Sequence, residues 1–416
     1  MNSFNPQIVV VGGGIAGCVA AIAAAEERKS VLLVDRSVRI GGNATNSNVG
    51  TICGAYYRNS SGIPRLTGYK FCELFISKLI ALSGSKPINY HNGLFVIPYE
   101  WSVLQSLLEQ QLKNADVTIW NEAEVTNLQT NQNRIAQLDV KKDGKRFQLN
   151  TDAVIDCSGN GIASQLARLN MLSSSSYQSA SQIFRVNKIL SDNEFSLNMA
   201  LKKTMVQLVN VNNWPVSFET LSVIPGSLKN NQADFKITMP GAVTDDPNLN
   251  GVLDTEAKAW VVKIFPYLTK NITSLKNAEI ATIFPELGIR VLQRSKGKSV
   301  LTEASILSCE KHDHGITIGT WPLEEWNADG TVKMEYPEND SGYMIPADCL
   351  ISYQLENLFF AGKNISATTK AIASARVMGT CLQTGYAAGK IASCISDEER
   401  EKMILNLNEE LRLRNG

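Results

Sequence analysis

The distribution of hydrophobic and polar residues at the start of the chain predicts a β-α-β unit. Residues 8–11 are a short apolar run rich in valine, and residues 18–27 have the alanine-rich pattern of a helix. A second apolar run at 30–34 is typical of a strand buried on both faces, and it ends at Asp35. This order predicts two parallel strands joined by a right-handed crossover.

Further elements follow along the chain. The helical period predicts helices over 68–83 and 98–114, whereas shorter apolar runs predict strands at 117–120, 124–128, 135–141, 147–150, 153–157 and 358–361. A helix of small residues is expected over 375–394, and Ser396 to Glu399 form a capping box that opens a last helix. Four serines at 173–176 indicate a boundary, and residues 177–336 show weaker periodicity.

Composition narrows the class of partner. The chain has 416 residues, with 40 Lys and Arg against 40 Asp and Glu, so its formal net charge is zero. This balance argues against nucleic acid and against a polybasic membrane anchor, and it fits a small-molecule partner. The sequence has no apolar run of the ~18 residues that a membrane span needs and no signal-peptide pattern. We therefore expect a cytoplasmic protein without a membrane partner, and its oligomeric state stays open.

Cysteine and histidine give little sign of a metal site. The eight cysteines include no C-x-x-C pair, so we expect buried free thiols in a reducing compartment. His312 and His314 alternate around Asp313, but no third ligand cluster lies nearby, and we interpret this stretch as a solvated loop. The sequence predicts no metal ion.

Three glycines form a dinucleotide-binding pattern in its full context. Gly12, Gly14 and Gly17 follow the first strand and open the first helix, and Asp35 lies 18 positions after Gly17. The first glycine permits a tight turn, the second lets a pyrophosphate approach the backbone, and the third permits close packing of helix and strand. The helix N-terminus offers N–H groups and a positive dipole end to the phosphates.

Two neighbouring residues bear on which nucleotide binds. Asp35 can accept hydrogen bonds from a ribose diol and would repel a ribose 2′-phosphate, which disfavours NADP. Arg36 could stack beside an adenine, and neither residue excludes NAD. A second G-x-G-x-x-G pattern is absent from the sequence, so a dedicated NAD(P)H domain is not expected.

The longer motifs carry a family resemblance. The pair Gly41 and Gly42 after the strand-end acid resembles flavoproteins of the two-domain, glutathione-reductase-like FAD-binding fold. The strings NVGTICGAYY at 48–57, IDCSGNG at 155–161 and LFFAGKNISATTKAIASARVMGTCLQTGYAAG at 358–389 narrow this to the FAD-dependent oxidoreductase family, and LGIRVLQRSKG at 287–297 is similar to its Gly-x-Arg stretch. The resemblance spans most of the chain and is thin between residues 175 and 280.

The resemblance implies a role for each matching residue. The turn at 12–17 would contact the FAD pyrophosphate, Asp35 the adenosine ribose, and Val125 the adenine through its backbone. Residues 158–159 would close over the adenosine, and Gly362 would approach the pyrophosphate or ribityl chain. The helix starting near 378–380 would aim its N-terminus at the flavin pyrimidine, where reduced flavin carries negative charge. The implied FAD-binding residues are Gly12, Gly14, Ile15, Ala16, Gly17, Asp35, Arg36, Gly41, Gly42, Asn43, Ala44, Val125, Ser158, Gly159, Gly362, Thr380 and Cys381.

The chain departs from the family pattern at several of these motifs. Lys363 stands where the family often has Arg, Thr369 where it often has His, and Gly379 where it often has Pro. Asp35 and Asn160 replace a more usual Glu and Asp. The changes at 369 and 379 lie near the expected flavin and weaken any transfer of mechanism from relatives.

The implied architecture is α/β: a Rossmann-like FAD-binding domain, with a parallel sheet and a crossover β-meander, plus an inserted α+β substrate domain. The FAD-binding domain is expected to be discontinuous, over residues 1–60, 98–172 and 340–395. Residues 61–97 and 173–339 would form the substrate or cap domain, and 396–416 a C-terminal helix.

The leading functional hypothesis is an FAD-dependent oxidase or dehydrogenase of specialised metabolism, whose flavin N5 takes a hydride from an organic small molecule. Oxygen or another acceptor would re-oxidise the flavin. The alternative is a flavin-dependent monooxygenase or halogenase-like enzyme that uses NAD(P)H or a reductase partner, and a third possibility is a flavin-bound protein without catalysis. Candidates for the substrate site are Tyr56, Tyr57, Arg58, Arg290, Arg294 and Arg376.

Among these, Tyr57 and Arg290 are the candidates for catalysis. Tyr57 follows a glycine-rich loop expected beside the isoalloxazine, where an aromatic ring would form a pocket wall and offer a hydroxyl. Arg290 could hold a carboxylate through two hydrogen bonds, or it could form a structural ion pair. The sequence identifies no general base.

Overall fold

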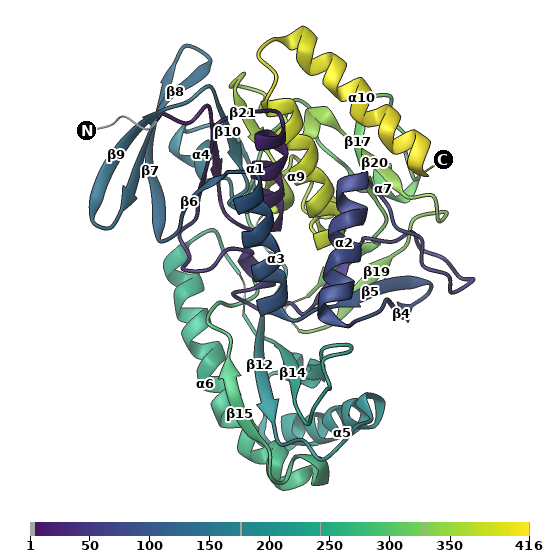
Figure 1. The fold of residues 1–416 in the computed structure, drawn as a ribbon. Helices are drawn as coiled ribbons and strands as arrows, with labels where there is room; N and C mark the ends of the chain where they lie inside the picture. The colour runs from purple at the N-terminus through teal and green to yellow at the C-terminus, as the bar shows by residue number, and fades with distance from the viewer. Residues whose placement is uncertain (1–4, 175–176, 242, 328, 416) are drawn as a thin grey trace.

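A five-stranded parallel sheet forms the centre of the upper part of the molecule (Figure 1). The structure is a computed structural model, and it describes residues 5–174, 177–241, 243–327 and 329–415. The strands lie in the order β21-β10-β1-β2-β6, with β1 in the middle. Their bounds are β1 (Ile8–Val11), β2 (Val31–Val34), β6 (Thr118–Trp120), β10 (Ala153–Asp156) and β21 (Leu358–Phe360). Apolar side chains on both faces of these strands are buried, as the continuous apolar runs predict.

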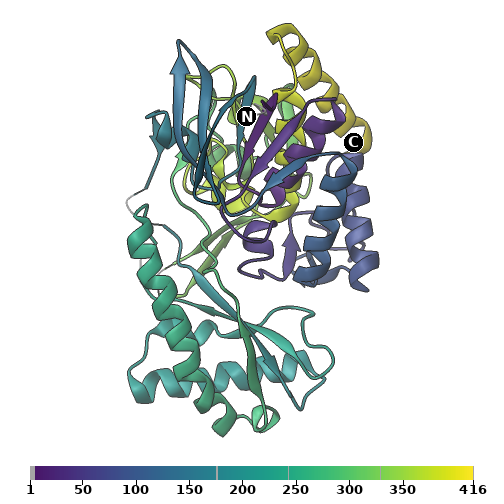
Figure 2. The same ribbon diagram turned by 60° about the vertical axis from the view of Figure 1, so that its left-hand side comes forward.

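Helices cover one face of this sheet, and an antiparallel meander covers the other (Figure 2). The helices are α1 (Ile15–Glu26), α3 (Trp101–Asn114) and α9 (Met378–Ala392), with α2 (Lys70–Ser83) packed beside α3. The meander consists of β7 (Ala123–Asn131), β8 (Arg134–Lys142) and β9 (Lys145–Asn150). Alternate residues of the meander, such as Leu138 and Val140, pack against apolar residues of β1 and β2 in the parallel sheet.

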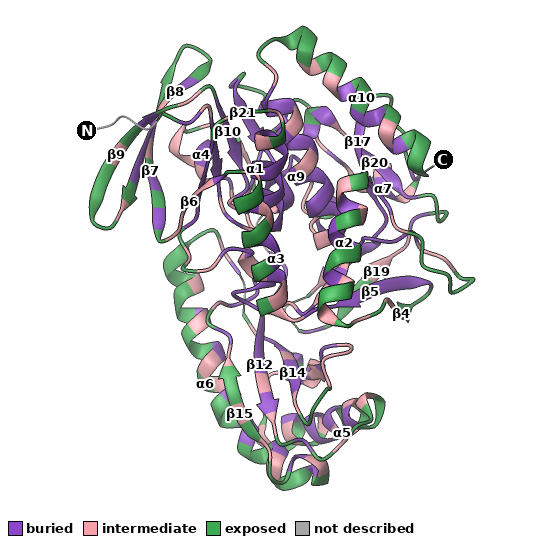
Figure 3. Cartoon of the chain, viewed as in Figure 1, coloured by how far each residue is buried: buried purple, intermediate pink, exposed green. Residues whose placement is uncertain are grey.

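Helices α1 and α9 approach each other closely because α9 carries glycine at the contact. A Cβ atom on Gly385 would lie 2.3 Å from the carbonyl oxygen of Ala16, and one on Gly389 would lie 2.4 Å from that of Ala20. Both distances are too short for any larger residue. Figure 3 shows these two helices as largely buried.

A lower lobe is built on a second, antiparallel sheet (Figures 1 and 2). Its strands lie in the order β13-β14-β12-β15, and two long helices pack against them. The bounds are β12 (Ser181–Asn187), α5 (Glu194–Asn212), β13 (Ser222–Val223), β14 (Ala233–Thr238), α6 (Pro247–Asn271) and β15 (Glu279–Ile283). The aromatic rings of Phe184, Phe235 and Phe265 meet in the core of this lobe.

Small sheets and short helices complete the upper part. One sheet has the order β3-β5-β4, and three strand pairs are β17-β20, β18-β19 and β11-β16. The remaining strands are β3 (Thr51–Cys53), β4 (Ile88–His91), β5 (Leu94–Pro98), β11 (Met171–Leu172), β16 (Arg294–Ser295), β17 (Gly315–Gly319), β18 (Leu323–Trp326), β19 (Val332–Glu335) and β20 (Tyr343–Pro346). The remaining helices are α4 (Ile162–Leu166), α7 (Glu303–Leu307), α8 (Ala371–Ala375) and α10 (Asp397–Asn415), with 3₁₀ turns at Gly42–Ala44, Val216–Thr220, Thr273–Leu275, Ala347–Cys349 and Gly362–Asn364.

The observed elements differ from the sequence expectations mainly at their ends. The helix expected over 98–114 begins at Trp101, because Leu94–Pro98 pairs as a strand with β3 and β4. The helix expected over 375–394 begins at Met378, because Val377 has an extended backbone. At the capping box, the Ser396 hydroxyl accepts from the Glu399 N–H at 3.2 Å, and the Glu399 carboxylate accepts from the Ile395 N–H at 2.8 Å.

The domain boundaries remain a prediction, although the structure places their residues. Strand β17, which falls within the expected substrate domain, packs on α9 and α10 in the upper part and pairs with β20, which falls within the expected FAD-binding domain. Residues 175–176 of the serine run lie outside the described residues, and 173–174 lie just before the lower lobe. Within the described residues, no helix has both the length and the apolar character needed to cross a membrane.

Candidate cofactor and substrate site

The glycine turn after β1 has a geometry that only glycine can adopt. Gly12 has φ +98°, and a Cβ atom there would lie 2.7 Å from the carbonyl oxygen of Cys157. A Cβ atom on Gly17 would lie 1.8 Å from the carbonyl oxygen of Gly12. A Cβ atom on Gly14 would meet nothing within 4 Å. Gly14 therefore faces open space at the carboxyl edge of the sheet.

The start of α1 is suited to an anion. Its N-cap residue is Gly14, which has no side chain to accept hydrogen bonds from the first turn, and that turn contains no acidic residue. The N–H groups of Ile15, Ala16 and Gly17 have no intrahelical acceptor. With the helix dipole, they make a positive end beside the open space at Gly14.

The loop after β2 lies against this turn. The Asp35 carboxylate is 8% exposed; it accepts from the Gly13 N–H, and from the Ser37 N–H at 2.7 Å. The Gly41 N–H donates to the Gly13 carbonyl at 2.6 Å, and Gly41 and Gly42 both have positive φ. The strand-end acid and the glycine pair thus hold the turn in place.

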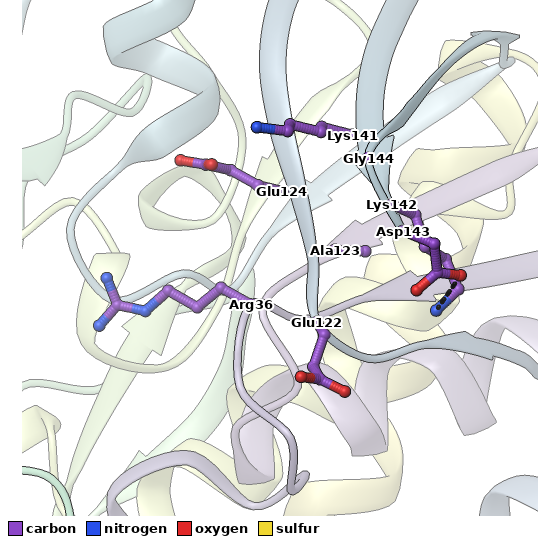
Figure 4. A pocket seen from close by; sticks show the side chains of 8 residues that line it. All are labelled: Arg36, Glu122, Ala123, Glu124, Lys141, Lys142, Asp143 and Gly144. Carbon is purple, nitrogen blue, oxygen red and sulfur yellow. Dashed lines mark ion pairs between the residues drawn. The ribbon is translucent and has the colours of Figure 1, made fainter.

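Arg36 extends from the end of β2 over a hollow of about 220 Å³ (Figure 4). Glu124 and Lys141 line the same hollow from the paired strands β7 and β8. Val125, next along β7, is buried and pairs with Val140. The structure thus brings Arg36 and Val125 to the same side of the parallel sheet.

The loop after β10 is held by a buried carboxylate. Asp156 accepts from the Ser158 N–H at 3.0 Å, the Ser158 hydroxyl at 2.6 Å and the Ala163 N–H at 2.8 Å. Burial raises the pKa of Asp156 above its usual value, and these hydrogen bonds oppose that shift. Because the Ser158 hydroxyl is used within the loop, Ser158 and Gly159 can offer a ligand mainly their backbone.

Lys363 joins this group after β21. A Cβ atom on Gly159 would lie 3.0 Å from Lys363 Cε, and Lys363 Nζ donates to the Ile289 carbonyl at 2.9 Å. The amide of Asn43 donates to the same carbonyl at 2.9 Å. Burial lowers the pKa of Lys363 to about 8. The sequence analysis identified this residue only as a departure from the family pattern, and no short-range motif indicated its position.

Gly362 lies where α1, α9 and the sheet meet. It has φ +68°; its N–H donates to the Thr384 hydroxyl at 3.1 Å, and a Cβ atom there would lie 2.9 Å from Ala16 Cβ. The structure therefore brings Gly362 beside the first turn of α1, and its approach to a pyrophosphate or ribityl chain stays a prediction.

The start of α9 is a second helix end that no side chain caps. Its N-cap residue Val377 has an apolar side chain, and its first turn contains no acidic residue. The Thr380 hydroxyl is buried and has no hydrogen-bond partner among the described residues. A Cβ atom on Gly379 would lie 2.3 Å from the backbone of Gly54, so the loop after β3 covers this end. Cys381 donates its thiol hydrogen to the Arg376 carbonyl at 3.1 Å, and burial raises its pKa to about 12.

The substrate candidates fall into separate groups. The Arg65 guanidinium lies over the ring of Tyr57, with Arg65 Cζ 4.9 Å from the ring centre. No contact among the described residues joins Tyr57 to Arg290. Burial raises the pKa of the Tyr57 hydroxyl to about 12. Arg58 pairs with Asp340, and the buried Arg294 donates to the Ala367 carbonyl at 2.9 Å. Tyr56 lines another hollow of about 430 Å³ near the C-terminal helix.

Arg290 and Arg376 belong to one cluster, which also contains Lys236, Glu324 and Trp326. The Trp326 ring centre lies 4.4 Å from Arg290 Cζ and 4.6 Å from Lys236 Nζ. Arg376 donates to the backbone carbonyl of Glu324 at 3.4 Å. Arg290 takes part in none of the ion pairs among the described residues. The structure therefore does not show the structural ion pair that was one of the two sequence-based alternatives for this residue.

The residues present fit a bound FAD. The open space at Gly14, the uncapped start of α1 and the ammonium of Lys363 suit a pyrophosphate. Buried polar atoms without a partner among the described residues, Ser47 Oγ, Asn48 Oδ1 and Thr380 Oγ1, lie in the loop at 43–55 and the first turn of α9. Orphaned polar atoms of this kind cost stability unless a ligand satisfies them. For a metal ion the described residues offer no group of three His, Cys, Asp or Glu ligands.

The solved structures to which the chain is similar include the following three, each with a TM-score below 0.5. A geranylgeranyl bacteriochlorophyll reductase-like protein from Thermoplasma acidophilum is 12% identical with a TM-score of 0.49, covering 100% of this chain and 85% of its own. The p-nitrophenol 4-monooxygenase PnpA from Pseudomonas putida DLL-E4 is 10% identical with a TM-score of 0.47, and the match covers 98% of this chain and 81% of PnpA. The flavin-dependent brominase Bmp2 is 12% identical with a TM-score of 0.48, covering 94% and 79%. Likenesses at this level do not indicate which activity this chain has.

The family itself is clear from the sequence. No curated protein matches the chain. The model of the FAD dependent oxidoreductase family matches residues 7–409, which is almost the whole chain and includes the glycine turn, the lower lobe and α9. The chain therefore belongs to the FAD dependent oxidoreductase family, whose cofactor is FAD.

Proposed function

We propose that this protein is an FAD-dependent oxidase or dehydrogenase that removes a hydride from a small organic molecule. The bond oxidised would be CH–OH, CH–NH or CH–CH. The observation that carries the proposal is the start of α9, where the helix end has no side-chain cap and the positive charge of Arg376 acts on Cys381 in the first turn. Positive charge at this point would stabilise the negative charge that hydride acceptance creates.

The parallel sheet, the meander and helices α1 and α9 would form a Rossmann-like FAD-binding domain of the glutathione-reductase-like type. The pyrophosphate would lie at Gly12, Gly14 and the start of α1, with Lys363 as an added cation. Asp35 would accept from the adenosine ribose, and the adenine would lie near Arg36 and Val125. Residues 41–44 would line the path to the flavin.

Bound FAD supplies the two-electron acceptor, and the side chains determine what reaches it. Apolar residues gather near the start of α9: Val377 clusters with Leu94, Val96 and Trp321, and Cys53 packs against this cluster. Such a surface excludes water from one wall of the site. The cations of the Trp326 cluster would orient the substrate. The lower lobe, with residues 61–97 and 173–339, would supply the substrate domain.

Anaerobic mixing tests the proposal. Purified protein should carry FAD with a flavin absorption spectrum, and its substrate alone should bleach that spectrum. Oxygen or an artificial acceptor should restore it, and peroxide should form if the acceptor is oxygen. Screening amino acids, sugars and other small organic acids and alcohols for this bleaching would identify the substrate.

Two results would overturn the proposal. Protein that is colourless and cannot be reconstituted with FAD would contradict cofactor binding. Reduction that requires NAD(P)H or a reductase, with oxygen or halogen entering the product, would instead identify a monooxygenase or halogenase-like enzyme.

A further inference from the structure

We infer that the substrate is an organic carboxylate whose anionic group is held by Lys236, Arg290 and Arg376. This inference rests on the proposed function, because it names the substrate class of the same site. The three cations come from separate parts of the chain: β14 of the lower lobe, the loop after β15, and the turn between α8 and α9. They meet only in the folded molecule.

Glu324 is the acidic side chain of this cluster, and each of its two oxygens accepts from a neutral donor. One accepts from the indole N–H of Trp321 at 2.7 Å, and the other from that of Trp326 at 2.8 Å. Within the described residues, Glu324 makes no ion pair with any of the three cations, although its negative charge acts on all of them. Three positive charges thus face one negative charge, which leaves the cluster with an excess of positive charge.

The aromatic ring of Trp326 holds two of these cations without neutralising them. Arg290 and Lys236 both lie within 5 Å of its ring centre, a cation–π geometry. Burial and neighbouring positive charge lower the pKa of Lys236 to about 8, and the same causes lower the pKa of Arg290. Like charges brought together away from water destabilise a protein unless an anion accompanies them.

Several donors in the cluster lack an acceptor. Arg376 donates to the Gln178 side-chain oxygen at 3.1 Å, but Arg376 Nε and Gln178 Nε2 are buried without partners among the described residues. Gln178 itself is 8% exposed. Lys236 Nζ makes no described hydrogen bond. An ionised carboxylate is an acceptor with about four lone-pair positions, and it can satisfy such a set.

Arg290 is fixed in position by the backbone around it. It donates to the Ser179 carbonyl and, at 2.6 Å, to the Ser181 hydroxyl. These neutral partners orient the guanidinium and leave its charge for a ligand. Planar groups, the amide of Gln178 and the guanidinium of Arg376, meet through a hydrogen bond. A guanidinium held in this way can pair with a carboxylate through two parallel hydrogen bonds.

The position of the cluster relates it to the cofactor. Arg376 lies two residues before α9, and its carbonyl accepts from the Cys381 thiol in the first turn. The apolar residues Trp321 and Val377 belong to one cluster near the start of α9, where they could contact the carbon skeleton of a substrate. An acid held by the cations would therefore present its neighbouring carbon to the start of α9.

Titration of the FAD-bound protein with acetate and benzoate, followed by the flavin absorption difference spectrum, tests the inference. Both carboxylates should bind with saturation, whereas acetamide and benzamide, their neutral counterparts, should not. Lys236→Met should weaken benzoate binding by at least about tenfold, and Lys236→Arg should retain it within about threefold. The matched control is Lys333→Met on β19, which removes the same charge from a side chain that is 61% exposed and should change nothing.

Each result has a distinct meaning. If the variants carry FAD but the wild-type protein binds amides as tightly as carboxylates, or binds inorganic phosphate and no carboxylate, the inference is wrong and the proposed function stands. If Lys333→Met weakens binding as much as Lys236→Met, general surface charge is responsible and the site is not at Lys236. Loss of FAD from the wild-type protein would overturn the proposed function itself.

Discussion

Two regions of this molecule are suited to anions, and they are built in different ways. At the carboxyl edge of the parallel sheet, the donors are backbone N–H groups at helix starts, and glycine keeps the space in front of them open. Around Trp326, the donors are long side chains from distant parts of the chain. A chain of zero net charge can thus accommodate negative ligands in both regions without a basic surface.

Because the donors differ, the two regions should also respond to different kinds of substitution. Backbone N–H donors are retained in every substitution except one by proline, so the first region is sensitive mainly to added volume. Side-chain donors can be removed one at a time, so the second region is sensitive to lost charge. Three glycine or threonine substitutions and one pH titration distinguish the two regions by their effects on stability and on ligand affinity.

Gly17→Ala should be the most damaging. Its methyl group would lie 1.8 Å from the carbonyl oxygen of Gly12, so the turn must move, at a cost of about 3 kcal/mol or more in unfolding free energy. Thermal unfolding and the ratio of flavin to protein absorbance measure the two effects. The control is Gly251→Ala in α6, where a Cβ atom meets nothing and stability should rise by up to ~1 kcal/mol. Equal stability of Gly17→Ala and wild type would contradict the packing argument.

Gly14→Ala should separate folding from cofactor binding. Its methyl group points into open space and its backbone conformation suits alanine, so stability without FAD should be unchanged. The same methyl group would occupy the approach of the pyrophosphate, so FAD affinity should fall at least about tenfold, or ~1.4 kcal/mol. Reconstitution of FAD-free protein, followed by fluorescence, measures this affinity. Unchanged affinity would show that the phosphates do not lie at this turn.

Carboxylate binding should depend on pH through Lys236. The groups around it are Arg290, Arg376, Glu324 and Cys53, and burial keeps the Cys53 thiol neutral by raising its pKa to about 12. Because the pKa of Lys236 is lowered to about 8, its charge is present below that pH and lost above it. Benzoate affinity should therefore be constant to about pH 7 and fall about tenfold by pH 9. Lys236→Met should bind weakly without this step, and a step that persists in it would assign the titration to another group.

Thr380→Val should have the smallest effect. The Thr380 hydroxyl is buried without a partner among the described residues, so replacing it with a methyl group should leave FAD-free protein as stable or stabilise it by about 1 kcal/mol. If the hydroxyl instead serves the cofactor, FAD affinity should fall a few-fold. Comparing unfolding temperatures with and without FAD distinguishes these effects, and a loss of stability without FAD would mean that the hydroxyl has a structural role.

The same contrast explains how much the sequence could predict. The β-α-β unit, the glycine turn and the start of α9 depend on local patterns, because glycine spacing and apolar runs are read over short distances. The structure brings Gly12, Gly14, Asp35, Gly42 and Gly362 together at one sheet edge, where the motifs imply a cofactor.

The second region could not be predicted in this way. Lys236, Glu324 and Gln178 belong to no motif, and they become neighbours only through the pairing of β14 with β12 and the contact of β18 with α8. The helices α5 and α6 were also missed. Both are long, but their apolar faces are weakly patterned, and α6 contains Pro266 in its interior. Arg290 and Arg376 are candidates on the sequence alone, but their common cluster with Lys236, Glu324 and Trp326 is visible only in the structure.

The close contact of α9 with α1 has a mechanical consequence. Gly385 and Gly389 bring α9 so close to α1 that a larger residue at either position would displace α9, and with it the start of the helix beside Arg376. Lys236 lies on β14 of the lower lobe. A ligand that bridges Arg376 and Lys236 would therefore join the lower lobe to the upper part, and its binding would add to the stability of the folded molecule.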